Sequence, residues 1–359
     1  MRLFGPIKLK HNRIERPFKG GYLLDELQDV ENPCDGYEAE SWIASTTKVA
    51  IGKRVDNYGL SKAVSYGEEY ILKDLVEKYP IEYLGQKHLD KFGENTAVLV
   101  KFIDSYSRLL IQVHPNKEYA KEYLNSDYGK TEAWHILAIR DIEGEKPYVY
   151  LGFKEGITRE KWRQAFLEQD IDGMIKMMHK IYVNQGDTIV VPSGVPHALG
   201  GGCLVIEIQE PTDFTMRVEK HRLDGAEISD EMIHNGLGVE KMLDCFSYEG
   251  LNKGELLNRY FIKEKEIASE KNFKRVELIN DDYKCYFKME KLEINKKVTI
   301  SKNYQFAIVV VIDGKGKIVY EGEDIELQKG DEIFIPACNK EFIFEGENLK
   351  VINCYPPSI

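Results

Sequence analysis

The chain has 359 residues, of which 43% are hydrophobic and 30% are charged, and its formal net charge is −11. These values are typical of a soluble globular protein with two or three domains, and the acidic balance argues against nucleic acid as the main partner. No apolar run is long enough to cross a bilayer, and the N-terminus lacks the apolar segment of a signal peptide. The six cysteines form no CxxC pair, so we expect reduced thiols, a cytoplasmic location and no membrane partner.

The first half of the chain alternates helical and β-type patterns. A strand is expected around Trp42, and apolar spacing predicts a helix over 68–92. Two β-rich runs follow at 97–105 and 108–116, and we expect them to form a hairpin. The polar stretch after them should begin as a helix, and a further strand is predicted over 131–140.

The second half begins with a predicted helix over 158–180, for which Thr158 is a good N-cap. Within 186–217, the run Ile-Val-Val reads as a short buried strand that ends in a Pro-Ser-Gly turn. A second strand is expected over 203–209, where Val205, Glu207 and Gln209 share one face because side chains alternate along a strand. Burying Glu207 is costly unless the carboxylate is paired or has a role in chemistry.

Within this stretch, Gly186, Pro192, Gly194 and His197 form the spacing G-x5-P-x-G-x2-H. This spacing resembles the second motif of the cupin superfamily, a small β-barrel that carries a metal. The pattern Gly-Asp-x-Ile-x-x-Pro recurs at 330–336, but there Asn339-Lys340-Glu341 replaces the segment that ends in His197.

This repeat predicts a mainly β fold with two cupin-like jelly-roll lobes and a small helical segment, and only the first lobe should bind metal. We expect a catalytic lobe over 1–230, a helical connection over 231–265 and a metal-free lobe over 266–359.

Four polar residues at strand or turn positions are candidates to hold that metal. Gln112 and His114 would point to the same face of a strand, about 7 Å apart along the backbone. Glu132 opens the next β segment, and His197 follows the Pro-Ser-Gly turn. Two imidazoles and a carboxylate suit zinc with a position left for water or substrate, although manganese, iron or cobalt would also fit.

Six segments follow one another along the chain: ERPFKGGYLL, ESWIAS, QVHPNK, GKTEAWHIL, VPSGVPHALGGGCLVIEIQ and DFTMRV. Together and in this order, they resemble type I mannose-6-phosphate isomerases. The resemblance implies one zinc ion per chain, held by Gln112, His114, Glu132 and His197. It also implies an active site that contains Arg217, Asp213, Lys130, Lys101 and Glu207. Leu110 stands where many members have a serine thought to help hold the phosphate, so the phosphate site is expected to differ here.

The implied reaction interconverts an aldose and a ketose phosphate through a cis-enediol, which needs a base and positive charge near the developing oxyanion. Arg217 would stabilise the oxyanion or the phosphate, and Lys130, Glu207 and Asp213 are the candidate bases. Alternatively, Lys130 and Lys101 are solvated surface residues, and Asp213 caps a turn or pairs with Arg217.

Two other classes of protein are alternatives to an isomerase. A metal-binding cupin sugar-phosphate sensor would keep the ligands without turnover, whereas cupin oxygenases usually use HxH and a further histidine. The expected partner is a small phosphorylated sugar, and the chain is expected to be a monomer or a homodimer.

Overall fold

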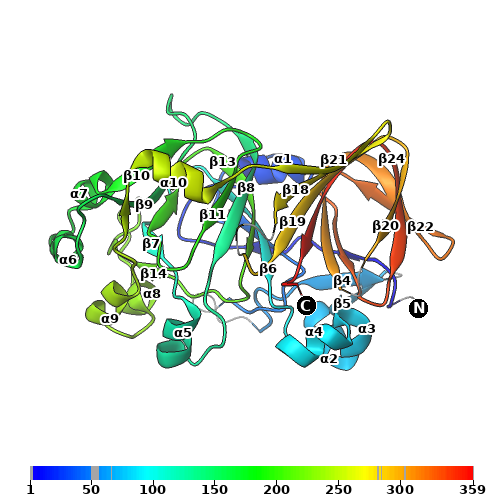
Figure 1. Ribbon diagram of the computed structural model, residues 1–359, viewed down its shortest axis with the longest axis horizontal. Helices are drawn as coiled ribbons and strands as arrows, with labels where there is room; N and C mark the ends of the chain where they lie inside the picture. The colour runs from blue at the N-terminus through cyan, green and yellow to red at the C-terminus, as the bar shows by residue number, and fades with distance from the viewer. Residues whose placement is uncertain are drawn as a thin grey trace.

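The computed structural model describes residues 3–49, 56–65, 67–280, 283, 285–302 and 305–358, and it is mainly β. Its described strands form three sheets (Figure 1). The helices are short and lie around the sheets: α1 Tyr22–Leu27, α2 Leu72–Lys78, α3 Pro80–Leu84, α4 Gln86–Phe92, α5 Lys117–Leu124, α6 Arg159–Glu168, α7 Ile171–Lys176, α8 Asp230–His234, α9 Val239–Asp244 and α10 Lys253–Tyr260. Among the described residues, no helix combines the length and apolar character needed to span a bilayer.

Two of the sheets belong to the first lobe. The seven-stranded sheet has the order β16-β11-β8-β13-β6-β3-β2. Its strands are β2 Arg13–Ile14, β3 Glu40–Ile43, β6 Leu99–Ser105, β8 Glu132–Ile139, β11 Thr188–Val191, β13 Cys203–Gln209 and β16 Phe261–Ile262. The six-stranded sheet has the order β10-β9-β12-β7-β14, with β15 beside β9. Its strands are β7 Gln112–Val113, β9 Tyr148–Lys154, β10 Met178–Tyr182, β12 His197–Leu199, β14 Met216–Arg217 and β15 Gly250–Leu251.

The third sheet has eleven strands and contains all the described strands of the C-terminal part. Its members are β1 Ile7–Leu9, β4 Lys62–Ser65, β5 Glu68–Ile71, β17 Lys265–Glu270, β18 Phe273–Ile279, β19 Lys288–Ile294, β20 Lys297–Ser301, β21 Ala307–Tyr320, β22 Glu323–Gln328, β23 Glu332–Ile335 and β24 Glu341–Tyr355. Three of these strands come from the N-terminal segment, because β1 pairs with both β23 and β4. The predicted domain boundaries stay a prediction.

Strand β13 lies between two hydrophobic cores, and its side chains point alternately into one and the other. Val205 packs in a core shared with residues of the six-stranded sheet, such as Leu151. Ile206 and Ile208 point the other way, into a core that also contains Phe334 of the eleven-stranded sheet. Because Glu207 lies on the Val205 face, the predicted period places this carboxylate between the two sheets of the first lobe.

The predicted hairpin of 97–105 and 108–116 is wrong. Strand β6 lies between β13 and β3 in one sheet, whereas the short β7 lies between β12 and β14 in the other. The intervening turn crosses between the sheets, where the buried Arg108 forms a bidentate ion pair with Glu219 at 2.7 and 2.9 Å. A long-range contact of this kind has no local sequence signal.

The predicted helix over 68–92 is wrong at its start and in its continuity. Residues 68–71 form the edge strand β5, and three short helices follow it. Pro80 occupies the first turn of α3, where its missing N–H costs little. Gly85 separates α3 from α4 with a φ of 85°, which other residues rarely adopt.

The predicted helix over 158–180 is correct only in its first part. Thr158 caps α6 by accepting a hydrogen bond from the Lys161 N–H. After α7, however, Met178–Tyr182 form β10, which pairs with β9 at the edge of the six-stranded sheet. The predicted helical connection over 231–265 likewise divides into α8, α9 and α10, with β15 between α9 and α10 and β16 after α10.

The predicted repeat is confirmed in the structure. Thr188–Val191 and Glu332–Ile335 are strands, each preceded by a glycine with φ of 94° or 88°. Asp187 and Asp331 each accept a hydrogen bond from the backbone N–H three residues earlier. In the second copy, Glu341 is exposed, and the lobe interior is filled by an apolar cluster that includes Ile318 and Phe344.

Candidate metal centre and active-site cavity

Strand register brings functional side chains into two facing rows. On the six-stranded sheet, Gln112 is the direct partner of both His197 and Arg217. On the seven-stranded sheet, Glu207 is the direct partner of both Lys101 and Trp134. Directly paired residues point to the same side of a sheet, so each row presents its side chains to the space between the sheets.

Two histidines and a glutamate converge at one end of this space. His114 Nε2 lies 3.2 Å from His197 Nε2 and 3.0 Å from Glu132 Oε2. His197 Nε2 lies 3.4 Å from Glu132 Oε1 and 3.2 Å from the side-chain amide of Gln112. Among the described residues, these two histidines and Glu132 are the only group of three or more His, Cys, Asp or Glu ligand atoms within 4.8 Å of one another.

The hydrogen bonds of the histidines suit metal binding. Nδ1 of His114 lies 2.9 Å from the Phe214 carbonyl oxygen, and Nδ1 of His197 lies 2.8 Å from that of Val195. A carbonyl can only accept, so both Nδ1 atoms carry the proton and both Nε2 lone pairs face the cluster. Burial lowers the pKa of both imidazoles, to about 3 for His114, where the charge of Lys130 adds to the effect. Among the described residues, no donor forms a hydrogen bond with the buried Glu132 Oε1. Such a set of unprotonated ligand atoms fits a divalent cation.

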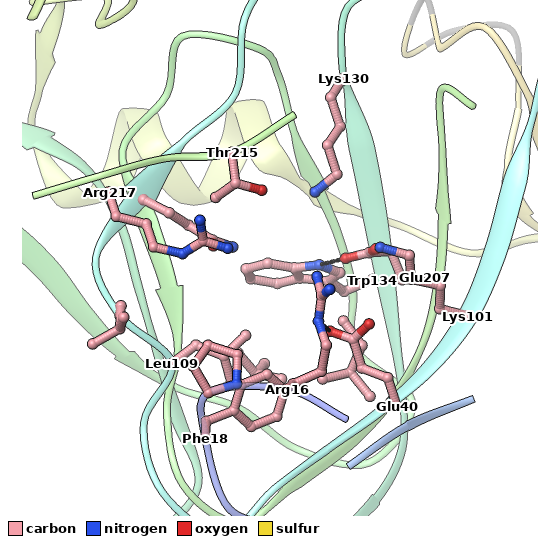
Figure 2. Close-up of a pocket in the computed structure, with 15 residues that line it drawn as sticks. Arg16, Phe18, Glu40, Lys101, Leu109, Lys130, Trp134, Glu207, Thr215 and Arg217 are labelled. Carbon is pink, nitrogen blue, oxygen red and sulfur yellow. Dashed lines mark hydrogen bonds and ion pairs between the residues drawn. The ribbon is translucent and has the colours of Figure 1, made fainter. Parts of the chain in front are cut away.

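A cavity between the sheets adjoins this cluster. It is lined by residues that include Arg16, Glu40, Lys101, Lys130, Glu207 and Arg217 (Figure 2). Lys101 and Lys130 are 2% and 4% exposed, so the alternative that they are solvated surface residues is wrong. Lys130 Nζ lies 2.7 Å from both His114 Nε2 and Glu132 Oε2, which places this cation beside the candidate ligands.

Glu207 lines the cavity, and only one of its two carboxylate oxygens accepts a hydrogen bond from the described residues. Its Oε2 accepts a hydrogen bond of 2.9 Å from the Trp134 indole N–H. Its Oε1 has no hydrogen-bond donor among the described residues and lies 3.6 Å from Lys101 Nζ. Burial, followed by the negative charge of Glu132, raises the pKa of Glu207 to about 7.

The family is decided by comparison with known proteins. The chain is 30% identical over 254 residues to the probable mannose-6-phosphate isomerase GmuF of Bacillus subtilis, which covers 71% of this chain and 73% of that protein. The chain belongs to the mannose-6-phosphate isomerase family. The family models for the type I phosphomannose isomerase catalytic domain and the mannose-6-phosphate isomerase cupin domain match residues 26–135 and 282–356.

Solved mannose-6-phosphate isomerases share the fold of this family member. The enzyme from Bacillus subtilis superposes with a TM-score of 0.76 at 24% identity, covering 98% of this chain and 99% of that chain. A zinc-bound holo mannose 6-phosphate isomerase superposes with a TM-score of 0.72 at 17% identity, covering 99% of this chain and 100% of that one.

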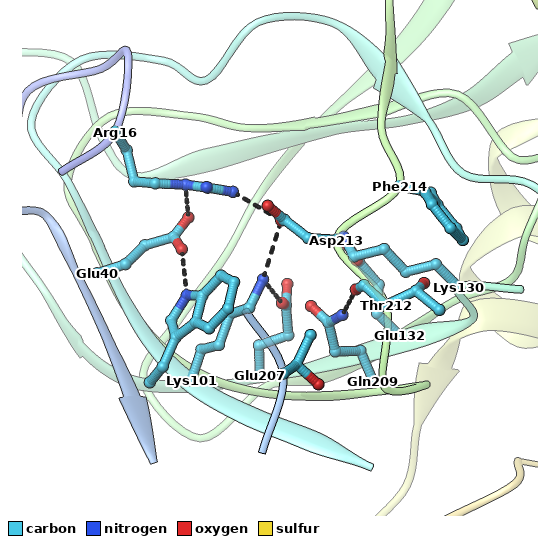
Figure 3. Close-up of polar contacts among 12 residues, drawn as sticks. Arg16, Glu40, Lys101, Lys130, Glu132, Glu207, Gln209, Thr212, Asp213 and Phe214 are labelled. Carbon is cyan, nitrogen blue, oxygen red and sulfur yellow. Dashed lines mark hydrogen bonds and ion pairs between the residues drawn. The ribbon is translucent and has the colours of Figure 1, made fainter. Parts of the chain in front are cut away.

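Sequence reasoning missed two charged residues of the cavity, Arg16 and Glu40. Arg16 Nε lies 3.0 Å from Glu40 Oε1, and Arg16 Nη2 lies 3.1 Å from Asp213 Oδ1 (Figure 3). Asp213 also lies 4.0 Å from Lys101 Nζ. Both missed residues fall inside the family-like segments ERPFKGGYLL and ESWIAS, which could have marked them as candidates.

The alternative in which Asp213 pairs with Arg217 is not found among the described residues. Arg217 Nη1 instead donates a 2.7 Å hydrogen bond to the Met232 carbonyl, and Arg217 forms no ion pair with a described carboxylate. Burial, together with the charge of Arg16, lowers the pKa of Arg217 to about 10.

A second cavity adjoins the first and shares Arg16, Thr215 and Arg217 with it. This outer cavity has a volume of about 170 Å³ and is also lined by Arg222 and Asn235. Leu110, which stands where many members of the family have serine, lines the inner cavity. Three guanidinium groups therefore line the outer cavity, while the Leu110 position offers no hydrogen bond from its side chain.

Proposed function

We propose that this protein is a zinc-dependent aldose–ketose isomerase that interconverts mannose 6-phosphate and fructose 6-phosphate through a cis-enediol intermediate. The observation that carries the proposal is the row of Lys101, Glu207 and Trp134 facing the row of His197, Gln112 and Arg217. This arrangement places a metal-ligand set beside a cavity that is lined by a buried carboxylate and several cations. Family membership supports the assignment of the substrate.

Gln112, His114, Glu132 and His197 would hold the zinc ion. The unprotonated Nε2 atoms and the free Glu132 oxygen fit this role. A bound zinc ion would polarise the sugar oxygens at C1 and C2 as a Lewis acid.

The charges around the cavities are complementary to a sugar phosphate. Arg16, Lys101, Lys130 and Arg217 balance Glu40, Glu132, Glu207 and Asp213 in formal charge. A divalent cation adds two positive charges, and a phosphate monoester at neutral pH carries about −1.5 to −2. We place the phosphate in the outer cavity, where the planar guanidinium group of Arg217 can bind its oxygens bidentately, while Arg222, which is paired with Asp224, adds positive charge. In this placement the arginines supply the hydrogen bonds to phosphate that the Leu110 side chain cannot donate.

Glu207 is the best supported of the three candidate bases. Glu207 lines the cavity, its Oε1 accepts no hydrogen bond from the described residues, and a pKa of about 7 suits a group that accepts and returns a proton. Asp213 is a poorer base because Arg16 and Lys101 outweigh the effect of burial and hold its pKa well below the usual range. Lys130 is already in contact with His114 and Glu132, so we assign it to the orientation of substrate oxygens.

A coupled assay tests the proposal directly. The purified protein should form fructose 6-phosphate from mannose 6-phosphate, lose this activity on treatment with a chelator, and regain it when zinc is added. A protein that contains metal and binds mannose 6-phosphate without forming product would instead be a sugar-phosphate sensor. Activity that survives complete metal removal would contradict the metal-dependent mechanism.

A further inference from the structure

The inference concerns Arg16, which lies two residues after strand β2, has a side chain that is 11% exposed, and stands where the inner and outer cavities meet. It rests on the proposed function in one respect, namely that Arg217 meets the anionic part of the substrate. The two arginines point into the same cavity in Figure 2, and both carry permanent positive charge. Their contacts, however, are very different.

Arg16 forms ion pairs with two carboxylates, whereas Arg217 forms none with a described carboxylate. Arg16 bridges Glu40 and Asp213 at 3.0 and 3.1 Å, and Figure 3 shows it between the two carboxylates. Arg217 has only the Met232 carbonyl as a hydrogen-bond partner among the described residues. Both carboxylates nevertheless lie near enough to Arg217 for their charges to act on its pKa, in opposition to burial and to Arg16.

We propose that Arg16 is a positioning residue that holds Glu40 and Asp213 away from Arg217 and so keeps Arg217 available for the anion. Without Arg16, the two carboxylates would lose the guanidinium that bridges them, and pairing with the neighbouring guanidinium of Arg217 would replace that contact. An Arg217 that is already paired binds an incoming phosphate less well, because the anion must first displace a carboxylate.

Arginine suits this position better than lysine for a geometric reason. The guanidinium uses Nε for Glu40 and Nη2 for Asp213, two donors fixed in one plane. A lysine ammonium is a single point charge and cannot hold both carboxylates in this arrangement. Arg16 also lies over the Trp42 ring, with 5.9 Å from Cζ to the ring centroid, and Trp42 donates to Glu40 at 2.9 Å, which fixes the arginine further.

The test compares Arg16→Gln, Arg16→Lys and the double variant Arg16→Gln/Asp213→Asn, with zinc-loaded protein throughout. Binding of inorganic phosphate is measured by isothermal titration calorimetry, and kcat and KM are measured with mannose 6-phosphate. For Arg16→Gln we expect the affinity for phosphate to fall about tenfold and KM to rise by a similar factor, the scale of one close charge pair. The change in kcat should be smaller. Arg16→Lys should lie between Arg16→Gln and the unmodified protein.

The double variant separates positioning from a general structural role. Removing the Asp213 charge in the Arg16→Gln background frees Arg217, so phosphate binding should recover at least in part. Arg13→Gln is the matched control, because Arg13 forms a comparable ion pair with Asp25 at 2.6 Å but lines neither cavity. This control should bind phosphate normally.

Two results would overturn the inference. One is unchanged phosphate binding in Arg16→Gln, or in Arg16→Lys if the glutamine variant does not fold. The other is a double variant that binds no better than Arg16→Gln. Phosphate binding is measured without turnover, so these results can be distinguished from a failure of the proposed function. If the proposed function failed, the unmodified protein would bind phosphate but form no fructose 6-phosphate.

Discussion

The imidazoles of His114 and His197 face each other with Nε2 atoms 3.2 Å apart, although 83 residues separate them in the sequence. Each ring is fixed by a carbonyl on its other nitrogen, so neither Nε2 has a proton to offer the other. Two lone pairs at this distance repel each other unless a donor or a cation lies between them. The geometry of the pair therefore leads to the first prediction, on metal content.

The purified protein should contain close to one divalent metal ion per chain, and His197→Ala should lose most of it. His135→Ala is the matched control, because His135 is also buried but contacts Thr188 and lies outside the ligand group. Elemental analysis provides the measurement. Equal metal content in the His197 and His135 variants would contradict the assigned ligands.

Replacing Arg217 by lysine should lower kcat/KM for mannose 6-phosphate by roughly 100-fold, the scale of losing one well-placed donor. The charge is kept, but the planar fork that can bind a phosphate bidentately is lost. Metal content and melting temperature should hardly change. Near-normal kinetics in Arg217→Ala would instead make Arg217 structural, and the anion would have to be held by Arg222 or Lys101.

Glu207→Gln should lower kcat by roughly 100-fold or more while the metal is retained, because the amide cannot accept the transferred proton. In the unmodified protein, kcat should rise as the pH increases through about 7, where Glu207 loses its proton. Trp134→Phe removes a hydrogen-bond donor to the Glu207 carboxylate. Losing this donor destabilises the charged form and raises the pKa of Glu207, so the rise in kcat should move to higher pH. An unchanged pH profile in both variants would exclude Glu207 as the base.

Glu332 should make the folded state less stable as the pH rises. Burial raises the pKa of Glu332 to about 8 despite hydrogen bonds from Gln28 and Ser41, while its ordinary value is 4.5. Between these values the folded state keeps a proton that the unfolded chain releases, so the stabilising contribution is complete below about pH 4.5 and is lost by about pH 8.

Glu332→Gln should therefore gain stability relative to the unmodified protein between pH 5 and pH 8, on the order of a few kcal/mol. Lys302, whose pKa burial lowers to about 7, titrates in both proteins, so their difference isolates Glu332. Chemical denaturation at the two pH values measures this difference. A difference that does not vary with pH would contradict the neutral state of Glu332.

The sequence by itself determined the features that depend on local spacing. The period of two along 203–209 placed Glu207 on the inner face, and the Gly-Asp-x-Ile-x-x-Pro repeat identified two equivalent strands, because turn geometry and side-chain alternation are set by neighbouring residues. The ligand candidates Gln112, His114, Glu132 and His197 were found for the same reason. Each lies at or just beside the end of a strand that has its own local pattern.

Only the tertiary structure decided what depends on strand pairing between distant segments. The register that aligns Arg217 with Gln112, and Lys101 with Glu207, follows from sheet packing. The ion pair of Arg16 with Asp213 joins residues 197 positions apart, which is why the sequence suggested Arg217 as the partner of Asp213. Similarly, residues 178–182 have a helical spacing but complete a sheet edge, because hydrogen bonds to β9 outweigh a weak local preference.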